Sequence, residues 1–558
     1  MEELKPRPAN SSPLTPLGFL ERAATIYGDS PSIIYAHTTY TWSETHHRCL
    51  QLASSLSSAG IQRGHVVSVI SPNTPPMYEL HFAVPMAGAI LNTISTRLDA
   101  RTISVLLCHS ESKLIFVDQA YYALIQDALA LFPPEINRPM LVLIADDAVA
   151  EESSSSVLIE GNFVGSYEEM IRKGDSDFRW IRPASEWDPI VLNYTSGTTS
   201  SPKGVVHCHR GSFIVTLDIL LEWGVPKQSV YLWTLPMFHC NGWSFSWGMA
   251  AVGGTNICIR KFDAGLIYSL IRRHHVTHLC GAPVVLNMLA NSPSNPTLDW
   301  PVKILTAGAP LPAAVVFHTE SLGFDVTHGY GLTETGGPVV FCSWKAQWNL
   351  LPGMERARMK SRQGVRAVAM TAVDVVDSNT GRSVKQDGVS TGEIVLRGGS
   401  IMVGYFKDLE ATAKSMTEDG WFFTGDVGVM HPDGYLEIKD RWKDVIISGG
   451  ENLSSVEVES ILYANPSVNE AAVVARPDEF WGETRCAFIS LREELAQKPI
   501  EEEIIEYCGG NLPRFMVPKT VVFMTDLPKT STGKIQKHLL REMAMSIGPT
   551  KRISKNNR

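Results

Sequence analysis

Short apolar runs rich in β-branched residues recur between helical stretches from about residue 30 to residue 440. Examples are VVSVI at 66–70, KLIFV at 113–117, MLVLIA at 140–145 and VKILTAG at 302–308. Continuous apolar runs of this length fit strands buried on both faces, and their alternation with helices is typical of parallel sheets covered by helices. This pattern predicts an α/β fold for most of the chain.

The sequence changes character near its C-terminal fifth, where VEVESILYANPSV, EAAVVARPD and IEEEIIEYCGGNLPRFMVP follow in a short α+β pattern. A chain of 558 residues is also too long for one ordinary domain. We therefore expect a large N-terminal domain of helix-covered sheets at 1–439 and a smaller, mobile α+β C-terminal domain at 444–558. The polar stretch between them contains the predicted hinge at 440–443.

The composition excludes several classes of protein. Hydrophobic residues make up 44% of the chain and charged residues 19%, which is typical of a folded globular protein and not of a disordered one. The net charge of −9 and the absence of a long basic run argue against nucleic acid or an anionic membrane surface as a partner. The apolar stretch at 77–94 is interrupted by Glu79, His81 and Pro85, so we expect no membrane insertion.

The ends of the chain and its cysteines predict a cytoplasmic location. The nine cysteines are scattered singly, without a CxxC pair, which favours free thiols in a reducing compartment. The N-terminus lacks the apolar core of a secretory signal, and the last residues do not form the small-basic-leucine tripeptide of peroxisomal import.

The sequence YTSGTTSSPKG at 194–204 follows the apolar run PIVLN and has the features of a phosphate-binding loop. Glycines allow backbone N–H groups to approach phosphate oxygens, hydroxyls donate further hydrogen bonds, and a lysine adds positive charge. The order of residues differs from a Walker A loop, because the lysine precedes a glycine. A solvated Ser/Thr linker is the alternative for this stretch alone. The candidate phosphate-binding residues are Thr195, Ser196, Gly197, Thr198, Thr199 and Lys203.

Four further motifs occur in a fixed order after this loop: HGYGLTET at 328–335, GWFFTGD at 420–426, DRWKDVIISGGEN at 440–452 and PKTSTGK at 528–534. Together the five motifs resemble the acyl-adenylate-forming superfamily, which includes acyl-CoA synthetases, adenylation domains of peptide synthetases and beetle luciferases. The stretches at 91–107 and 235–247 resemble plant acyl-activating enzymes for short-chain, medium-chain or aromatic acids. The resemblance implies ATP, Mg²⁺ and coenzyme A as substrates and cofactors.

The resemblance assigns nucleotide-binding roles to two of these motifs. Tyr330, between Gly329 and Gly331, would stack on adenine, and the hydroxyl of Thr333 would donate to a phosphate oxygen. Glu334 is an oxygen ligand suited to Mg²⁺. The resemblance also implies that Asp426 and Arg441 bind the ribose. Spacing alone leaves open a solvated Glu334, a turn role for Asp426 and a solvated Arg441.

The resemblance assigns the catalytic lysine to Lys534, which would bridge the substrate carboxylate and the α-phosphate during adenylate formation. By itself, a lysine near a C-terminus is usually a surface charge. Lys443 matches the residue about which the small domain rotates before the second half-reaction. Gly449 and Gly450 would then line a narrow passage for the pantetheine arm of coenzyme A. A plain turn is the alternative for these two glycines.

His239 matches an aromatic gate between the acyl site and the thiol, although a lone histidine after an apolar run is more often a core residue. The resemblance places several neighbouring segments around the acyl group, and for Trp243 and Phe245 ordinary core packing is an equally good interpretation. The expected acyl-pocket residues are Asn241, Trp243, Phe245, Ala307, Gly308, Gly331, Pro338 and Val339.

Gly331 carries a specific expectation about acyl-chain length. Acetate-specific relatives have a tryptophan at this position, so a glycine is expected to leave open the space for an acid longer than propionate.

These observations predict an ATP-dependent carboxylate–CoA ligase that forms an acyl-AMP intermediate. The expected substrate is a short- to medium-chain fatty acid, with branched acids included. An aromatic acid of the benzoate or cinnamate type is the alternative substrate, and a luciferase-like oxygenase or a ligase that serves a carrier protein is the alternative activity. No obligate protein partner is implied.

Overall fold

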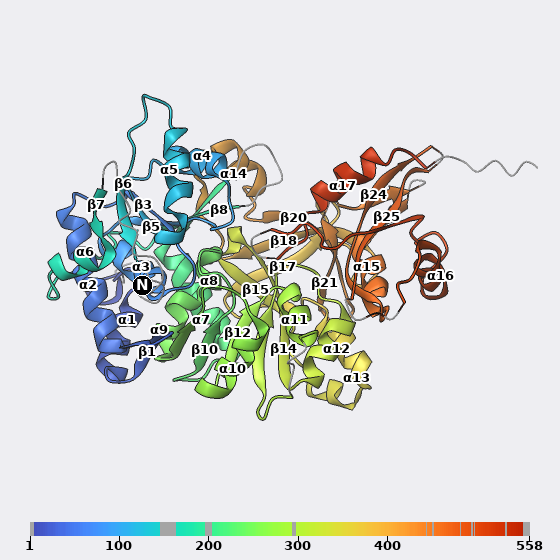
Figure 1. The fold of residues 1–558 in the computed structure, drawn as a ribbon, viewed down its shortest axis with the longest axis horizontal. Helices are drawn as coiled ribbons and strands as arrows, with labels where there is room; N and C mark the ends of the chain where they lie inside the picture. Colours follow the sequence, from blue (N-terminus) through green and yellow to red (C-terminus); the bar gives the residue numbers. More distant parts are fainter. Residues whose placement is uncertain are drawn as a thin grey trace, which may run out of the picture.

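The computed structural model describes residues 5–145, 163–195, 203–292, 297–441, 444–448, 451–479, 481–492, 495, 497–530 and 533–550. Figure 1 shows the early helices and strands at one end of the long axis and the C-terminal elements, in orange and red, at the other. The predicted architecture, a large N-terminal domain of helix-covered sheets followed by a smaller α+β domain, is confirmed.

The first sheet of the large domain has eight strands in the order β19-β9-β8-β4-β3-β5-β6-β7. From β8 to β7 the neighbouring strands are parallel, and β8 and β9 form an antiparallel hairpin. Every residue of β3 is buried, as its uninterrupted apolar sequence predicts. The strands are β3 (Val66–Ile70), β4 (Ile90–Thr93), β5 (Leu114–Asp118), β6 (Met140–Ile144), β7 (Phe163–Ser166), β8 (Pro189–Tyr194), β9 (Gly204–Cys208) and β19 (Gly404–Tyr405).

Helices and short 3-10 turns connect these strands and the first residues of the chain. They are η1 (Pro8–Asn10), α1 (Gly18–Tyr27), α2 (Trp42–Ser58), α3 (Pro75–Met86), α4 (Ala100–Ser110), η2 (Gln119–Tyr121), α5 (Tyr122–Ala130), α6 (Tyr167–Lys173) and α7 (His209–Glu222).

The second sheet of the large domain has nine strands in the order β16-β15-β14-β13-β12-β10-β11-β1-β2. The strands from β14 to β1 are parallel to their neighbours, and the strands at both edges are antiparallel. The strands are β1 (Pro31–Tyr35), β2 (Thr38–Thr41), β10 (Val230–Trp233), β11 (Thr255–Cys258), β12 (His278–Gly281), β13 (Val302–Thr306), β14 (Phe324–Leu332), β15 (Gly337–Phe341) and β16 (Val365–Arg366).

The helices associated with this sheet lie between its strands in the sequence. They are α8 (Cys240–Trp243), α9 (Phe245–Val252), α10 (Ala264–His274), α11 (Pro283–Ala290), α12 (Ala313–Ser321), η3 (Thr333–Thr335), η4 (Ala346–Leu350) and α13 (Gly353–Lys360). One apolar core joins the two sheets, since it contains Val67 and Val191 from the first sheet and Trp233 and Leu305 from the second.

A third sheet of the large domain was not predicted from the sequence. It is antiparallel, with β17 (Met370–Val376), β18 (Thr391–Gly398), β20 (Phe422–Met430) and β21 (Leu436–Arg441) in that order, and α14 (Leu409–Ser415) lies between β19 and β20 in the sequence. The repeated apolar runs indicated strands here but did not specify their direction. Figure 1 shows this sheet between the two parallel sheets and the C-terminal domain.

The C-terminal domain has a mixed sheet in which β26 adds to β25 in parallel. Its elements are β22 (Ile446–Ser448), β23 (Glu451–Leu453), α15 (Ser455–Ala464), β24 (Val468–Asp478), β25 (Gly482–Leu491), α16 (Glu501–Asn511), β26 (Thr520–Phe523) and α17 (Lys537–Ser546). Asp440 and Arg441, the first half of the predicted hinge, belong to β21, and Lys443 lies outside the described residues. Rotation about Lys443 therefore stays a prediction.

Two expectations about composition can be compared with the structure. Among the described residues, no helix is long and apolar enough to cross a membrane. The apolar stretch that begins near residue 77 forms α3, which has 12 residues and is almost entirely buried in the large domain. The nine cysteines are free thiols, and eight of them are buried.

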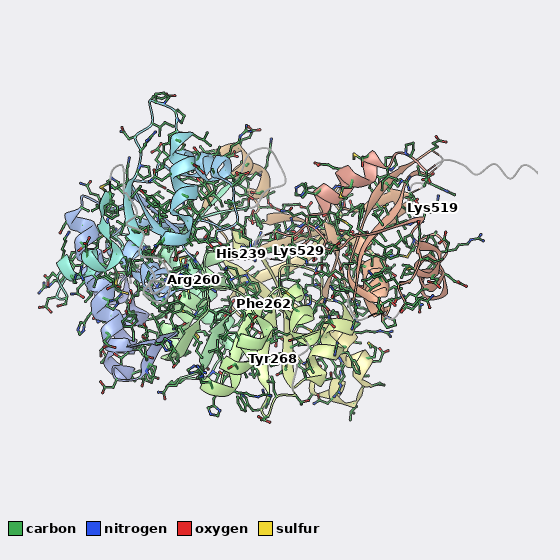
Figure 2. All side chains as sticks on the ribbon, in the orientation of Figure 1. His239, Arg260, Phe262, Tyr268, Lys519 and Lys529 are labelled. Carbon is green, nitrogen blue, oxygen red and sulfur yellow. The ribbon has the colours of Figure 1, made fainter. Side chains whose placement is uncertain are left out.

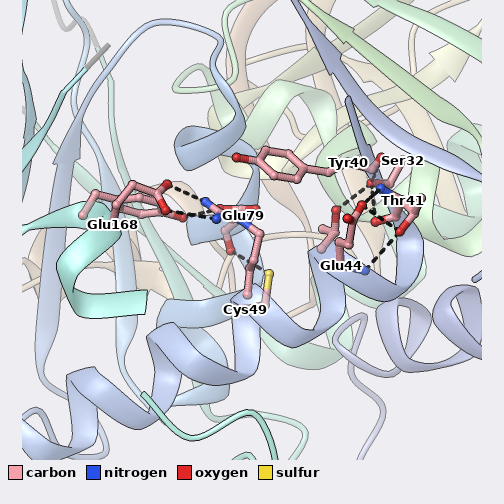
Figure 3. Close-up of polar contacts among 10 residues, drawn as sticks. Ser32, Tyr40, Thr41, Glu44, Cys49, Glu79 and Glu168 are labelled. Carbon is pink, nitrogen blue, oxygen red and sulfur yellow. Dashed lines mark hydrogen bonds and ion pairs between the residues drawn. The ribbon is translucent and has the colours of Figure 1, made fainter. Parts of the chain in front are cut away.

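A buried ion cluster joins helices α2, α3 and α6. The guanidinium of Arg48 contacts Glu79 at 2.6 Å and Glu168 at 2.7 Å, and the hydroxyl of Tyr167 donates to Glu79 at 2.6 Å (Figure 3). Burial raises the pKa of Glu79, and the neighbouring Arg48 opposes that shift. Since the side chain of Glu79 has no exposed surface, its charge depends on these partners.

Replacing Arg48 by methionine should destabilise the fold strongly, because Glu79 would keep a buried carboxylate without its cation. Breaking a buried ion pair in this way costs about 3 to 5 kcal/mol. The matched control is Lys414→Met, because the Lys414–Glu410 pair is 73% and 79% exposed and should contribute little. Thermal unfolding of both variants checks this expectation, and equal midpoints for the two would contradict it.

Candidate functional site

The predicted phosphate loop joins β8 to β9 at the carboxyl end of the first parallel sheet. The hairpin is closed at its base, where Tyr194 pairs with Gly204 and the amide of Thr195 donates to the carbonyl of Lys203 at 3.1 Å. The ammonium of Lys203 lies 4.6 Å from the ring centroid of Tyr405, a cation–π contact. Of the other predicted phosphate-loop residues, Ser196, Gly197, Thr198 and Thr199 lie outside the described residues.

The candidate metal ligand Glu334 lies in the 3-10 turn η3, which four contacts hold in place. The hydroxyl of Tyr405 donates to Oε1 of Glu334 at 2.8 Å, and the amide of Met402 donates to its backbone carbonyl at 2.8 Å. Nε2 of His207 donates to the carbonyl of Thr333 at 2.7 Å, and Sγ of Cys240 lies 3.4 Å from the hydroxyl of Thr333. Burial lowers the pKa of His207 to about 4, so this imidazole is neutral near pH 7.

This turn fits a magnesium ion held jointly by one carboxylate and the phosphates of a nucleotide. The described residues include no group of three or more His, Cys, Asp and Glu side chains able to bind a metal by themselves. Mg²⁺ commonly binds through one or two carboxylates plus substrate phosphates. Within the described residues, the carboxylate of Glu334 accepts a hydrogen bond at one oxygen, and its second oxygen suits a metal ion.

The candidate nucleotide-binding residues Tyr330, Asp426 and Arg441 are in direct contact. The hydroxyl of Tyr330 donates to Oδ2 of Asp426 at 2.8 Å, and Nε of Arg441 lies 3.3 Å from Oδ1. Strands β20 and β21 create this contact, since Asp426 and Arg441 are cross-strand partners. Burial raises the pKa of Asp426, and Arg441 and the Tyr330 hydroxyl oppose that shift. Both carboxylate oxygens of Asp426 thus contact other residues of the site, which a simple turn role does not require.

Lys534 of the C-terminal domain lies against the large domain. A Cβ built on Gly308 would be 3.0 Å from Cε and 3.5 Å from Nζ of Lys534, so the lysine lies beside the GAP turn that follows β13. Gly308 has a φ of +89°, which glycine adopts readily. Burial lowers the pKa of Lys534 to about 8, with Arg441 acting in the same direction and Cys240, Asp426 and Glu334 opposing. The surface-charge interpretation of this lysine is therefore wrong.

The loop that carries Lys534 also contacts the large domain next to helix α11. A Cβ on Gly533 would be 2.3 Å from Cγ1 of Val284, and the side-chain amide of Asn287 donates to the carbonyl of Asn469 at 2.9 Å. Within the loop, the amide of Lys534 donates to the hydroxyl of Thr530 at 3.1 Å. These contacts hold the C-terminal domain and the loop of Lys534 against the large domain.

His239 is partly buried and lies close enough to Lys534 to feel its charge. Burial and the nearby charge of Lys534 together lower the pKa of His239 to about 3. Figure 2 shows His239 near the centre of the molecule, with Lys529, which precedes the Lys534 loop, in the same region. A neutral imidazole beside the lysine is compatible with a gate role, but that role stays a prediction.

A left-handed turn follows His239. Residues 240–244 all have positive φ angles between 45° and 64°, and only one of them is glycine. Left-handed conformations cost about 1 to 2 kcal/mol for each residue with a side chain, so the surroundings must enforce the turn. Asn193 donates to Oδ1 of Asn241 at 2.8 Å, and a Cβ on Gly242 would lie 2.3 Å from the Trp233 ring.

The predicted acyl-pocket residues lie around this turn and the adjacent strands, and most are deeply buried. Phe245 stacks on Tyr231 with ring centroids 4.9 Å apart and meets Trp223 edge-on, so core packing explains this residue well. The exposed fractions are 2% for Asn241, 5% for Trp243, 1% for Phe245, 3% for Ala307 and 0% for Val339, and Pro338 is also buried.

The structure corrects the expectation for Gly331. This residue lies in β14 at an irregular pairing with β15, and a Cβ there would be 2.0 Å from the carbonyl oxygen of Gly337. Glycine is therefore required by close backbone approach and does not leave an open space. A tryptophan at this position would distort the sheet, so it is not a usable test of acyl-chain length. Gly329 is also confined, with Pro338 at 3.3 Å from its virtual Cβ.

Lys443, Gly449 and Gly450 lie outside the described residues, so their expected roles in rotation and in coenzyme A binding stay predictions. Two residues of the site were missed from the sequence. Tyr405 lies outside the five motifs, and its contacts depend on β19 pairing with β9, which is distant in sequence. Cys240 directly follows His239, but a lone cysteine gave no signal of its contact with Thr333.

Comparisons with known proteins match both domains of the chain. The AMP-binding enzyme family model matches residues 20–406, and the model of its C-terminal domain matches residues 457–534. A 2-methylpropanoate–CoA ligase of Humulus lupulus is 69% identical over 98% of each chain. A probable acyl-activating enzyme 5 of Arabidopsis thaliana, named as peroxisomal, is 63% identical over 99% of each chain. The structure of the ATP-bound RpMatB-BxBclM chimera B3 has a TM-score of 0.80 and 25% identity, covering 95% of this chain and 99% of that one.

The chain belongs to the AMP-binding enzyme family. Within it, this protein is an acyl-CoA synthetase of the AMP-forming type.

The pKa of Lys534 predicts a pH dependence for adenylate formation. The lysine must be cationic to stabilise the phosphate charge, and with a pKa of about 8 it loses that charge as the pH rises through 8. kcat/KM for pyrophosphate release should therefore be high below this value and fall above it. In Lys534→Arg the fall should disappear even if the rate is lower, because a guanidinium stays charged. An unchanged alkaline limb in Lys534→Arg would contradict the assignment.

Proposed function

We propose that this protein activates 2-methylpropanoate or a similar short branched acid with ATP and transfers the acyl group to coenzyme A. The observation that carries this proposal is the 69% identity, over 98% of both chains, to the Humulus lupulus enzyme named 2-methylpropanoate–CoA ligase. This proposed substrate is narrower than the short- to medium-chain acid that the sequence predicts.

The packing around the predicted acyl pocket supports a small acid. Of the expected pocket residues, Trp243, Phe245 and Val339 are all buried, and close packing of such side chains favours a short acyl chain. Adding methylenes to a well-packed site costs about 1 to 3 kcal/mol through displaced side chains. A compact branched chain suits such a site better than hexanoate or an aromatic ring.

In the first half-reaction, a carboxylate oxygen of the acid attacks the α-phosphorus of ATP and pyrophosphate leaves. Lys534 holds its positive charge between the carboxylate and the α-phosphate, which reduces their mutual repulsion. Asp426 and Arg441 position the ribose, and Tyr330 provides a face for adenine. A magnesium ion at Glu334 would neutralise negative charge on the phosphates of ATP.

In the second half-reaction, the thiol of coenzyme A attacks the acyl carbon and AMP leaves. The lysine has no role in this step, so its loop can leave the site. We infer that the C-terminal domain turns about Lys443 and presents Gly449 and Gly450 to the pantetheine arm. His239 would move aside to admit the thiol.

The cytoplasmic location is also a proposal. One relative is named as peroxisomal, so targeting can differ within this group. A fluorescent fusion at the N-terminus, which leaves the C-terminus free, should give a diffuse cytosolic signal in plant cells. Colocalisation with a peroxisomal marker would contradict the proposal.

Pyrophosphate release over a panel of acids tests the substrate. Each methylene buried in an apolar pocket contributes about 0.8 kcal/mol, so 2-methylpropanoate should exceed acetate in kcat/KM by roughly ten-fold to twenty-fold. Hexanoate and benzoate should be poorer than 2-methylpropanoate, because the buried aromatic residues restrict the pocket. A preference for benzoate or hexanoate would contradict the proposed substrate.

The same panel with and without coenzyme A distinguishes the activities. We expect acyl-CoA and AMP to accumulate when coenzyme A is present, and enzyme-bound acyl-AMP when it is absent. Light emission or oxygen consumption would instead support a luciferase-like enzyme. Acyl-AMP that reacts with a carrier protein but not with coenzyme A would support a carrier-protein ligase.

A further inference from the structure

Tyr405 lies where the phosphate hairpin and the metal turn meet. Its short strand β19 pairs with β9, with Tyr405 opposite Val205, and the amide of Phe406 donates to the carbonyl of Gly204 at 2.6 Å. The residue is 9% exposed. Backbone pairing therefore fixes this tyrosine beside the end of the phosphate hairpin.

Two different parts of the Tyr405 side chain contact two different charged residues. The hydroxyl donates to Oε1 of Glu334 at 2.8 Å, and the ring face lies 4.6 Å below the ammonium of Lys203. The same segment holds the backbone of Glu334, because the amide of Met402 donates to its carbonyl at 2.8 Å. One side chain thus bridges the candidate metal carboxylate and the candidate phosphate-binding lysine.

We propose that Tyr405 is a positioning residue that sets the separation and orientation of Glu334 and Lys203 for the magnesium complex of ATP. This inference rests on the proposed use of ATP by the site. The hydroxyl binds one carboxylate oxygen of Glu334, so the other oxygen faces the metal in a fixed direction. The ring restricts Lys203 to one direction of approach to the phosphates.

The two contacts can be separated by substitution. Tyr405→Phe keeps the ring beneath Lys203 and removes only the hydrogen bond to Glu334. Tyr405→Leu removes both contacts. Loss of a residue that orients a metal ligand typically weakens metal affinity by about ten-fold to a hundred-fold, so Tyr405→Phe should weaken Mn²⁺ binding in the presence of ATP by that factor. Tyr405→Leu should also weaken the binding of metal-free ATP, which Tyr405→Phe should leave unchanged.

Tyr435 provides a matched control. Like Tyr405, Tyr435 is buried, its hydroxyl donates a hydrogen bond and its ring lies beside a lysine. The hydroxyl of Tyr435 donates to the carbonyl of Ser343 at 2.6 Å, and the ammonium of Lys345 lies 4.4 Å from its ring centroid. Its contacts lie outside the candidate site. Tyr435→Phe should therefore cost similar stability while leaving Mn²⁺ and ATP affinity unchanged.

The experiment is electron paramagnetic resonance titration of Mn²⁺ in the presence of ATP, with calorimetric titration of ATP alone and thermal unfolding of each variant. The magnesium dependence of pyrophosphate release gives a second readout, and Tyr405→Phe should need about ten-fold more Mg²⁺ for half-maximal rate. If folded Tyr405→Phe binds Mn²⁺ as the wild type does, or if Tyr435→Phe loses as much affinity, the proposal is wrong.

These outcomes are separate from those that test the proposed function. If the wild-type protein released no pyrophosphate with any acid, that result would contradict the proposed function. The manganese titration would still report whether Tyr405 orients Glu334, because it needs only ATP and the metal ion.

Discussion

The position of Lys534 against Gly308 is the contact on which the rest of the site depends. It brings a cation from the C-terminal domain close to Asp426, Arg441 and Glu334 of the large domain. Removing an ammonium group from water costs free energy, and this cost lowers the pKa of Lys534 to about 8. A substrate carboxylate and a phosphate would add further opposite charge beside this lysine.

The large domain prepares this position through backbone geometry as much as through charge. Gly308 and Gly331 lie where a side chain would collide with the lysine or with a neighbouring strand. The left-handed turn after His239 is held by the Asn193–Asn241 hydrogen bond and by the Trp233 ring. These constraints hold the backbone around the expected acyl site, and the selectivity that we propose would depend on the packing of Trp243 and Val339 and not on one open position.

Sequence motifs predicted the α/β architecture, the smaller C-terminal domain and the residues that meet at the site. Tyr330, Asp426 and Arg441 were assigned through family resemblance, and the structure brings them into direct contact. Spacing could not show that β17, β18, β20 and β21 form an antiparallel sheet, because apolar runs do not encode strand direction. Spacing also could not show that the backbone of Gly337 lies close to Gly331, or that Tyr405 contacts both Glu334 and Lys203. Both features depend on strand pairing that the motifs do not reveal.

The central claim is that Lys534 serves adenylate formation and not thioester formation. It is tested most directly by single-turnover measurement of both half-reactions in Lys534→Ala. The account predicts a loss of acyl-AMP formation from acid and ATP by several orders of magnitude, with acyl-CoA formation from pre-made acyl-AMP largely retained. An equal loss in the two half-reactions, in a variant that unfolds at the wild-type temperature, would contradict it.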